Sequence, residues 1–223
     1  MKTNMETPPG ESSDYFKTIV AVLIALVTVT GALVAWRASL ANSSAGDADF
    51  AGLTATLNTE ETRTLNKANL YANYQAYVSY VHYNELGNLI NADLKSAAPE
   101  AAPNLEHQQA EAWDLATANQ YFFPSRYLDR EGNYDTQRQL GEAWAEAGLG
   151  KDLNPEPHFA ESDRLRTRAN WLVGTITALA GALLLYTVAA EMNRVFKYAL
   201  ALGGTLFLFA GVITALAVEV LMR

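Results

Sequence analysis

The chain has 223 residues, half of them hydrophobic, and carries a formal net charge of −8 at pH 7. Proteins that bind nucleic acid show a basic patch, so this acidic balance argues against nucleic acid as a partner. The absence of cysteine excludes disulfides, thiolate catalysis and zinc sites built on cysteine. Hydrophobic residues are concentrated in three stretches that are almost free of charge.

The first apolar stretch covers residues 18–36 and follows a polar N-terminal tail, residues 1–17. It has no charged residue and is long enough to cross a hydrocarbon core of about 30 Å. A signal peptide is the competing interpretation, with Ser39-Leu40-Ala41 as a weak cleavage site. The length of the apolar run and of the leader before it favours an uncleaved membrane anchor.

Residues 37–170 are predicted to form a helical domain outside the membrane. The turn-forming cluster at 42–47 predicts a break after the first span. A long helix is then expected to begin at a cap provided by Asn58 or Thr59 and to end near Ser96, shortly before a proline.

Tyrosines stand at every third position of this long helix, at Tyr71, Tyr74, Tyr77, Tyr80 and Tyr83. Because a helix advances about 100° per residue, such a row fans around most of its circumference. One apolar stripe is expected to pack against the protein's own helices, and it contains Leu70, Tyr74, Tyr77, Val78 and Val81.

The remaining tyrosines of the row predict a second surface on the opposite side of this helix. Tyr80 and Tyr83 are expected there, with Asn73 and Asn84 beside them. Tyrosine is enriched at protein interfaces, which makes these four residues the candidate interface. Half-buried tyrosines with solvated hydroxyl groups are the simpler interpretation, and a ligand cage is a third.

Two shorter helices are expected in the same domain. The first covers 104–119 and ends before the aromatic cluster 121–124, which is expected either to be buried at a corner or to touch the membrane interface. Asp135 is expected to cap the second, which reaches Ala147 with Gly148 in the C-terminal position. No β-pattern is present.

From about Pro157 a further helix is expected to run directly into the second apolar stretch, 171–190. The short loop 191–197 joins it to the third stretch, 198–221, so these two spans form an antiparallel hairpin. The predicted fold class is therefore all-α, an integral membrane protein with three transmembrane helices.

Small residues recur in the last two spans, and such residues let helices approach closely. They include Gly174, Ala178, Gly181, Ala199, Gly203, Gly204 and Gly211. We expect packing within the hairpin, although an oligomer contact would show the same pattern. Two acidic residues, Glu191 and Glu219, stand at span ends, where an interfacial position is expected rather than a proton relay.

Three arginines precede the second span at Arg164, Arg166 and Arg168. They are the candidate contact for lipid headgroups, and an ordinary juxtamembrane anchor is the alternative. Basic residues are almost equally distributed between the two sides, but the short loop between the last two spans carries Arg194 and Lys197. The rule that short positive loops stay inside favours a cytoplasmic N-terminus and an extracytoplasmic domain.

The sequence contains no phosphate-binding loop, hydrolase elbow or metalloprotease motif. His82 and Glu85 are correctly spaced to meet on one helix face, as any polar pair on a solvated face would be. We therefore predict no catalytic residue, no metal site and no cofactor.

The order of parts resembles an uncharacterised family of bacterial membrane proteins with one N-terminal span, a helical middle region and a C-terminal two-span hairpin. The segment Tyr71 to Ala76 is similar to a W/Y-x-x-Y-Q-A motif of that family, with Tyr74-Gln75-Ala76 as the matching part. The resemblance implies the three-span topology and no particular activity.

These observations predict a non-enzymatic, multi-pass protein of the cell (inner) membrane whose helical domain mediates assembly. Its expected partners are membrane lipid and either itself or another membrane protein, as a homo-oligomer or an accessory subunit. A component of an oligomeric channel or transporter is the alternative, with threonines of the first two spans as the only polar lining: Thr18, Thr28, Thr30, Thr175 and Thr177. An enzyme with its site near His82 and Glu85 is the second alternative.

Overall fold

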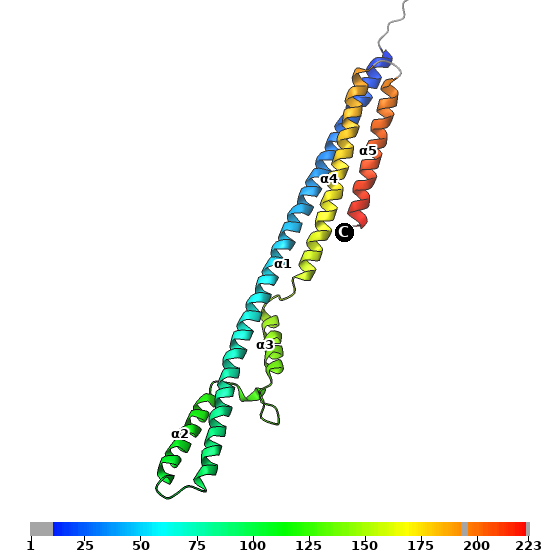
Figure 1. Cartoon of the computed structure of the whole chain (residues 1–223). Coiled ribbons are helices and arrows are strands. Elements are labelled where there is room, and N and C mark those ends of the chain that lie inside the picture. The colour runs from blue at the N-terminus through cyan, green and yellow to red at the C-terminus, as the bar shows by residue number, and fades with distance from the viewer. Residues whose placement is uncertain (1–10, 193–195, 222–223) are drawn as a thin grey trace, which may run out of the picture. The chain divides into compact units, whose positions relative to one another are not determined.

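The computed structural model describes residues 11–192 and 196–221, and side chains from residue 15 onward. Described residues form no strand beyond the single bridge between Leu128 and Tyr134. The elements are α1 (Glu11–Leu94), α2 (Ala102–Gln120), the 3₁₀ helix η1 (Ser125–Tyr127), α3 (Thr136–Gly150), α4 (Glu156–Glu191) and α5 (Phe196–Leu221) (Figure 1). The all-α prediction is confirmed.

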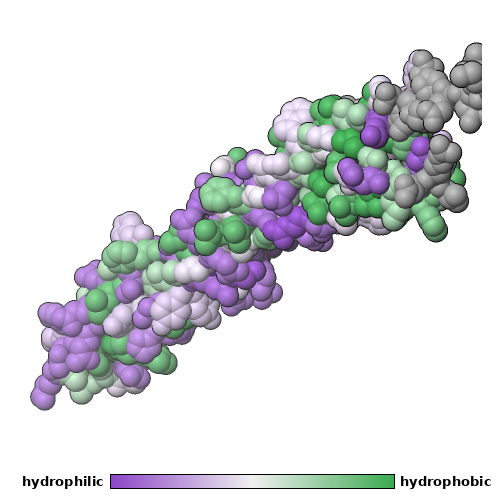
Figure 2. Space-filling model, turned by 90° about the horizontal axis from the view of Figure 1, so that it is seen from above, coloured by the Kyte–Doolittle hydropathy of each residue, from purple (hydrophilic) through white to green (hydrophobic). Residues whose placement is uncertain are grey.

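Three helices, α1, α4 and α5, contain segments long and apolar enough to cross a membrane. This agrees with the three predicted spans. The chain divides into two compact units: unit 1 consists of Met1–Leu53 and Glu156–Arg223, and unit 2 of Thr54–Pro155. Figure 2 shows hydrophobic side chains gathered over the apolar helices of unit 1, and a mainly hydrophilic surface on unit 2.

The predicted break at 42–47 was wrong, because α1 continues through it without interruption. The polar and flexible residues of this segment lie on the exposed side of the helix, whereas Ala41 and Ala45 are buried. A helix interior accepts Asn, Ser and Gly at a modest cost in propensity when packing holds the opposite face. The predicted caps at Asn58 and Thr59 were wrong for the same reason, since both lie inside α1.

The core of unit 1 follows a seven-residue repeat. On α1 the buried positions include Val20, Val27 and Val34, and on α4 they include Leu172, Leu179 and Tyr186. Six of the residues on these two helices belong to one buried cluster with α5: Val20, Val27, Val34, Leu172, Leu179 and Tyr186. This spacing is characteristic of helices packed as in a coiled coil.

Beyond the apolar stretch, the buried side of α1 changes from valine to small residues. Ala38, Ala41 and Ala45 are each at most 6% exposed. At Gly52 the ring of Phe159 on α4 packs so closely that a Cβ atom would lie 2.8 Å from it. The small residues on the buried side of α1 therefore let α1 and α4 approach each other (Figure 1).

The helices α4 and α5 form the expected hairpin, and the small residues allow the two helices to pack closely. A Cβ atom at Gly211 would lie 3.0 Å from Leu179, and one at Gly204 would lie 3.0 Å from Tyr186. Ala182 is fully buried. Close packing inside one chain thus accounts for these positions, whereas a Cβ at Gly174 would meet nothing within 4 Å.

Unit 2 consists of the second half of α1 with α2, η1 and α3. The indole of Trp113 on α2 lies directly against Gly87 on α1, closer than a Cβ at that position would allow. Near α3, Lys151 pairs with Glu61 at 2.7 Å, and Thr59 donates a 2.8 Å hydrogen bond to the carbonyl of Leu153.

Asp135 caps α3 as predicted, accepting a 2.9 Å hydrogen bond from the backbone N–H of Arg138. The predicted end at Gly148 was too early, because α3 continues to Gly150. Among described residues only Gly132 has a positive φ, so Gly148 does not adopt the left-handed conformation that ends many helices.

Candidate functional site

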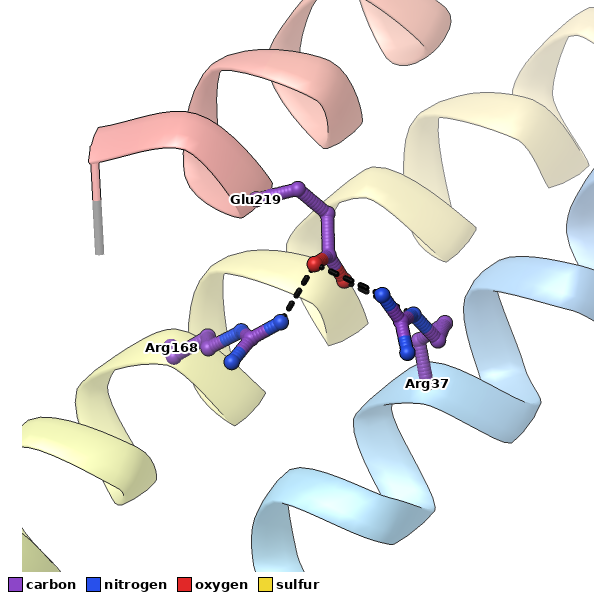
Figure 3. A network of polar contacts seen from close by, with 3 residues as sticks. All are labelled: Arg37, Arg168 and Glu219. Atoms are coloured by element: carbon purple, nitrogen blue, oxygen red, sulfur yellow. Dashed lines mark hydrogen bonds and ion pairs between the residues drawn. The ribbon is translucent and has the colours of Figure 1, made fainter. Parts of the chain in front are cut away.

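Three charged side chains meet where α1, α4 and α5 come together in unit 1 (Figure 3). Glu219 accepts two hydrogen bonds from Arg37, one from Nε and one from Nη2, each 3.0 Å long. The same carboxylate forms an ion pair with Arg168 of α4. One acidic group thus links all three helices of unit 1.

This Arg37–Glu219–Arg168 network is partly protected from solvent. The side chains of Arg168 and Glu219 are 18% and 25% exposed, and that of Arg37 is 48% exposed. Two guanidinium groups share one carboxylate, so the network keeps a net positive charge. Nε of Arg168 is buried and has no hydrogen-bond partner among the described residues.

The three arginines predicted to contact lipid headgroups each have a carboxylate partner within unit 1. Arg164 pairs with Glu161 one turn earlier, at 2.8 Å, and Arg166 pairs with Asp49 of α1. Arg168 belongs to the network with Glu219. Arg166 and Arg168 therefore connect α4 to α1 and α5, and a contact with lipid stays a prediction.

A cation–aromatic contact marks the other end of the same helices. Phe16 of α1 and Tyr198 of α5 pack edge to face with ring centroids 5.3 Å apart. The ammonium group of Lys197 lies over both rings, at 4.5 Å and 5.0 Å from their centroids. The beginning of α1 and the beginning of α5 thus lie together, as the predicted topology requires.

Unit 2 contains an aromatic cluster around Phe123, Tyr127 and Tyr134, all at most 8% exposed. Tyr77 packs on Phe123 and Tyr134 with centroids 5.6 Å and 5.5 Å away. Burial raises the pKa of the Tyr134 phenol above its ordinary value, and a hydrogen bond with Asn73 opposes that shift. The Tyr134 hydroxyl also donates to Gln139 at 2.8 Å.

Tyr80 and Asn73 of the candidate interface lie on the aromatic cluster instead of facing away from it. Tyr80 packs on Phe123 with centroids 5.6 Å apart, and the Asn73 side chain lies near enough to Tyr134 to lower the pKa of its phenol. The prediction that Tyr80 points away from the stripe was wrong, because η1 and its flanking loop bring Phe123 to that side of α1. The rings of Tyr83 and His82 meet edge to face, and Asn84 is half-buried. An interface at these four residues stays a prediction.

The aromatic run at 121–124 divides between two environments. Phe123 is 4% exposed and belongs to the cluster, which confirms a buried corner for that residue. Tyr121 and Phe122 are 85% and 71% exposed. Phe122 lines a groove of about 490 Å³ between α1 and the end of α2, with Ala72, Gln75, Ala76, Ser79 and Asn119.

The threonines considered as a channel lining are engaged with their own helices. Thr28, Thr30, Thr175 and Thr177 each donate a hydrogen bond to the carbonyl four residues earlier, at 2.8 to 3.3 Å. These four hydroxyl protons are therefore used within their own helices, and the channel alternative stays a hypothesis.

His82 and Glu85 are both exposed on α1. Across residues 11–192 and 196–221, no group of three or more His, Asp or Glu side chains is placed to hold a metal ion. His107 pairs with Glu111 one turn later at 3.3 Å, as ordinary helix neighbours do.

Comparisons with known proteins found no matching family model, no similar curated protein and no similar solved structure. The resemblance to the uncharacterised three-span family therefore stays a prediction.

Proposed function

We propose that this protein is a non-enzymatic, three-span membrane protein whose helical domain, predicted at 37–170, lies outside the membrane and mediates assembly. Assembly joins copies of this chain or attaches it to another membrane protein as an accessory subunit. The apolar segments of α1, α4 and α5 support the membrane placement.

The observation that carries the assembly role is the exposure of Tyr121 and Phe122 at the end of α2. A domain outside the membrane gains nothing by leaving two adjacent aromatic rings in water, and aromatic residues are enriched at the centres of protein interfaces. The groove that Phe122 borders has small and polar walls, which admit a side chain from a partner. We call Tyr121, Phe122 and this groove the α2 surface.

The proposal is tested by extracting the protein from its native membranes in mild detergent and separating complexes on a native gel. We expect a band at a multiple of the protomer mass, or a stoichiometric complex with a second membrane protein identified by mass spectrometry. The double variant Tyr121→Ser, Phe122→Ser should lose that band. Leu149→Ser, which removes a 90% exposed side chain of α3 elsewhere in unit 2, is the control and should keep it.

For orientation we propose a cytoplasmic N-terminus and an extracytoplasmic domain. Since the chain has no cysteine, single cysteines can be introduced at Ser96, between α1 and α2, and at Met192, at the end of α4. A membrane-impermeant maleimide applied to intact cells should label Ser96→Cys and spare Met192→Cys. The reverse pattern would invert the proposed orientation.

A further inference from the structure

A second groove in unit 2 lies between α1 and α3, and it differs from the α2 surface in its chemistry. It has a volume of about 360 Å³ and is lined by Arg63, Asn66, Lys67, Gln137, Leu140, Gly141 and Trp144. Leu140 and Trp144 provide apolar walls, and the α1 side chains provide cations and an amide. Small-molecule sites combine an apolar lining with a few convergent polar groups at volumes of about 300 to 1,000 Å³.

The charge of this groove is opposite to that of its surroundings. Acidic residues outnumber basic ones in unit 2, yet none lines this groove. Arg63 is paired with Glu60 at 2.8 Å, whereas Lys67 has no ion-pair partner among the described residues. A cation without a carboxylate beside it attracts an anion from solution.

Asn66 supplies a second indication. Its amide nitrogen Nδ2 is buried and has no hydrogen-bond partner within the described part of the chain. A buried donor without an acceptor is costly, so native structures normally satisfy such groups. Because this atom has almost no solvent-accessible surface, an acceptor oxygen in the groove satisfies it only after the Asn66 amide turns toward the groove.

We propose that the α1–α3 groove binds a small organic carboxylate with an apolar body. The carboxylate pairs with the ammonium group of Lys67 and accepts from Asn66 Nδ2 once that amide turns toward the groove, while the apolar body covers Trp144 and Leu140. This combination selects an anion over a neutral analogue of the same shape, because only the anion pairs with Lys67. The proposal does not depend on the assembly role.

The test uses the full chain in nanodiscs, labelled with 5-fluorotryptophan, and follows its fluorine resonances. The Trp144 signal is assigned by its loss in Trp144→Phe. The probes are 4-phenylbutyrate and its neutral analogue 4-phenylbutanamide. We expect a saturable shift of the Trp144 signal with the carboxylate, and binding at least fivefold weaker with the amide. Equal binding of the two, or no shift of Trp144 at millimolar carboxylate, would overturn the proposal.

Variants separate this site from nonspecific binding. Lys67→Gln should weaken carboxylate binding by roughly fivefold, as expected for one exposed ion pair. Lys95→Gln removes the same charge from an exposed position that does not line the groove, and should leave binding unchanged. If both variants weaken binding equally, the carboxylate is attracted by overall charge and the proposal fails.

Asn66→Leu gives a readout that does not require binding. It removes the unsatisfied donor, so the ligand-free protein should unfold at the same or a higher temperature while carboxylate binding falls about tenfold.

Gly141→Leu fills the groove from the α3 side, where a Cβ meets nothing within 4 Å. It should abolish binding, and Gly150→Leu, at another position with open space, should retain it. Full binding by Gly141→Leu would place the ligand elsewhere.

Discussion

Tyr186 of α4 packs its ring onto the backbone of α5 at Gly204, where a Cβ atom would lie 3.0 Å from ring carbon Cε1. The ring is fully buried, and its hydroxyl shares a 3.0 Å hydrogen bond with Thr205 Oγ1. Neither the Tyr186 ring nor the α5 backbone can shift without losing this packing and the hydrogen bond with Thr205. Gly204→Ala should therefore destabilise the hairpin by about 1 to 3 kcal/mol, the usual cost of overpacking, measured as a lower midpoint of thermal unfolding in detergent.

Gly174→Ala is the matched control for this prediction. It makes the same chemical change on the partner helix at a position where a Cβ meets nothing within 4 Å. Its unfolding midpoint should equal or exceed that of the unchanged protein, since alanine favours helix over glycine. Equal destabilisation by both variants would show that the Tyr186 contact is not the cause.

Glu219→Gln should destabilise unit 1, because Arg37 and Arg168 would then face each other without a shared anion. The partial exposure of the network limits the loss to about 2 kcal/mol, below that of a fully buried pair. Unfolding in increasing denaturant measures it. Glu161→Gln removes only the exposed pair with Arg164 and should cost less than about 0.5 kcal/mol. A loss no larger for Glu219→Gln than for Glu161→Gln would contradict a linking role.

Gly46→Ala tests the continuity of α1 through the segment expected to be a turn. Gly46 lies inside the helix and has open space where a Cβ would stand. Alanine should therefore stabilise the protein by up to about 1 kcal/mol. Circular dichroism during thermal unfolding measures the effect. A clear loss of stability would indicate that the chain turns at this position.

The loop after η1 should respond to acid through Asp129. Hydrogen bonds from Asn133, first from its backbone N–H, hold the pKa of this carboxyl below its ordinary value. A depressed carboxyl pKa contributes stability above the unfolded-state value, and this is lost as pH falls through the folded-state value. Carbon-detected NMR should place the Asp129 midpoint below that of the aspartates whose carboxylates accept no backbone hydrogen bond. Asn133→Ala removes the 3.3 Å side-chain bond but keeps the backbone N–H, so it should raise the midpoint only slightly. An unshifted midpoint in the unchanged protein would contradict this geometry.

The spans, the hairpin and the Asp135 cap were predictable because each depends on local sequence. Apolar length specifies a span, and a capping side chain acts on the N–H groups beside it. The break at 42–47 was mispredicted because turn propensity depends only on the local residue types and takes no account of tertiary packing. Whether Ala41 and Ala45 face a partner helix depends on α4, more than a hundred positions later.

Long-range pairing also explains what sequence reasoning missed. Glu219 was expected only at the membrane interface, and nothing local indicates that Arg37, 182 positions earlier, accompanies it there. Tyr80 was assigned to an outer surface because the path of the chain after α2 is not encoded in the helical period of α1. The exposure of Phe122 beside a buried Phe123 likewise depends on that path.

The central claim, assembly through the α2 surface, is tested most directly by photo-cross-linking in native membranes. p-Benzoylphenylalanine is placed at Phe122 and, in a matched variant, at Leu149, which is more exposed but lies outside the α2 surface. The account predicts one discrete protein adduct from position 122, to a second copy or to a single partner identified by mass spectrometry, and none from position 149. The same weak adducts from both positions, or no protein adduct from position 122, would contradict it.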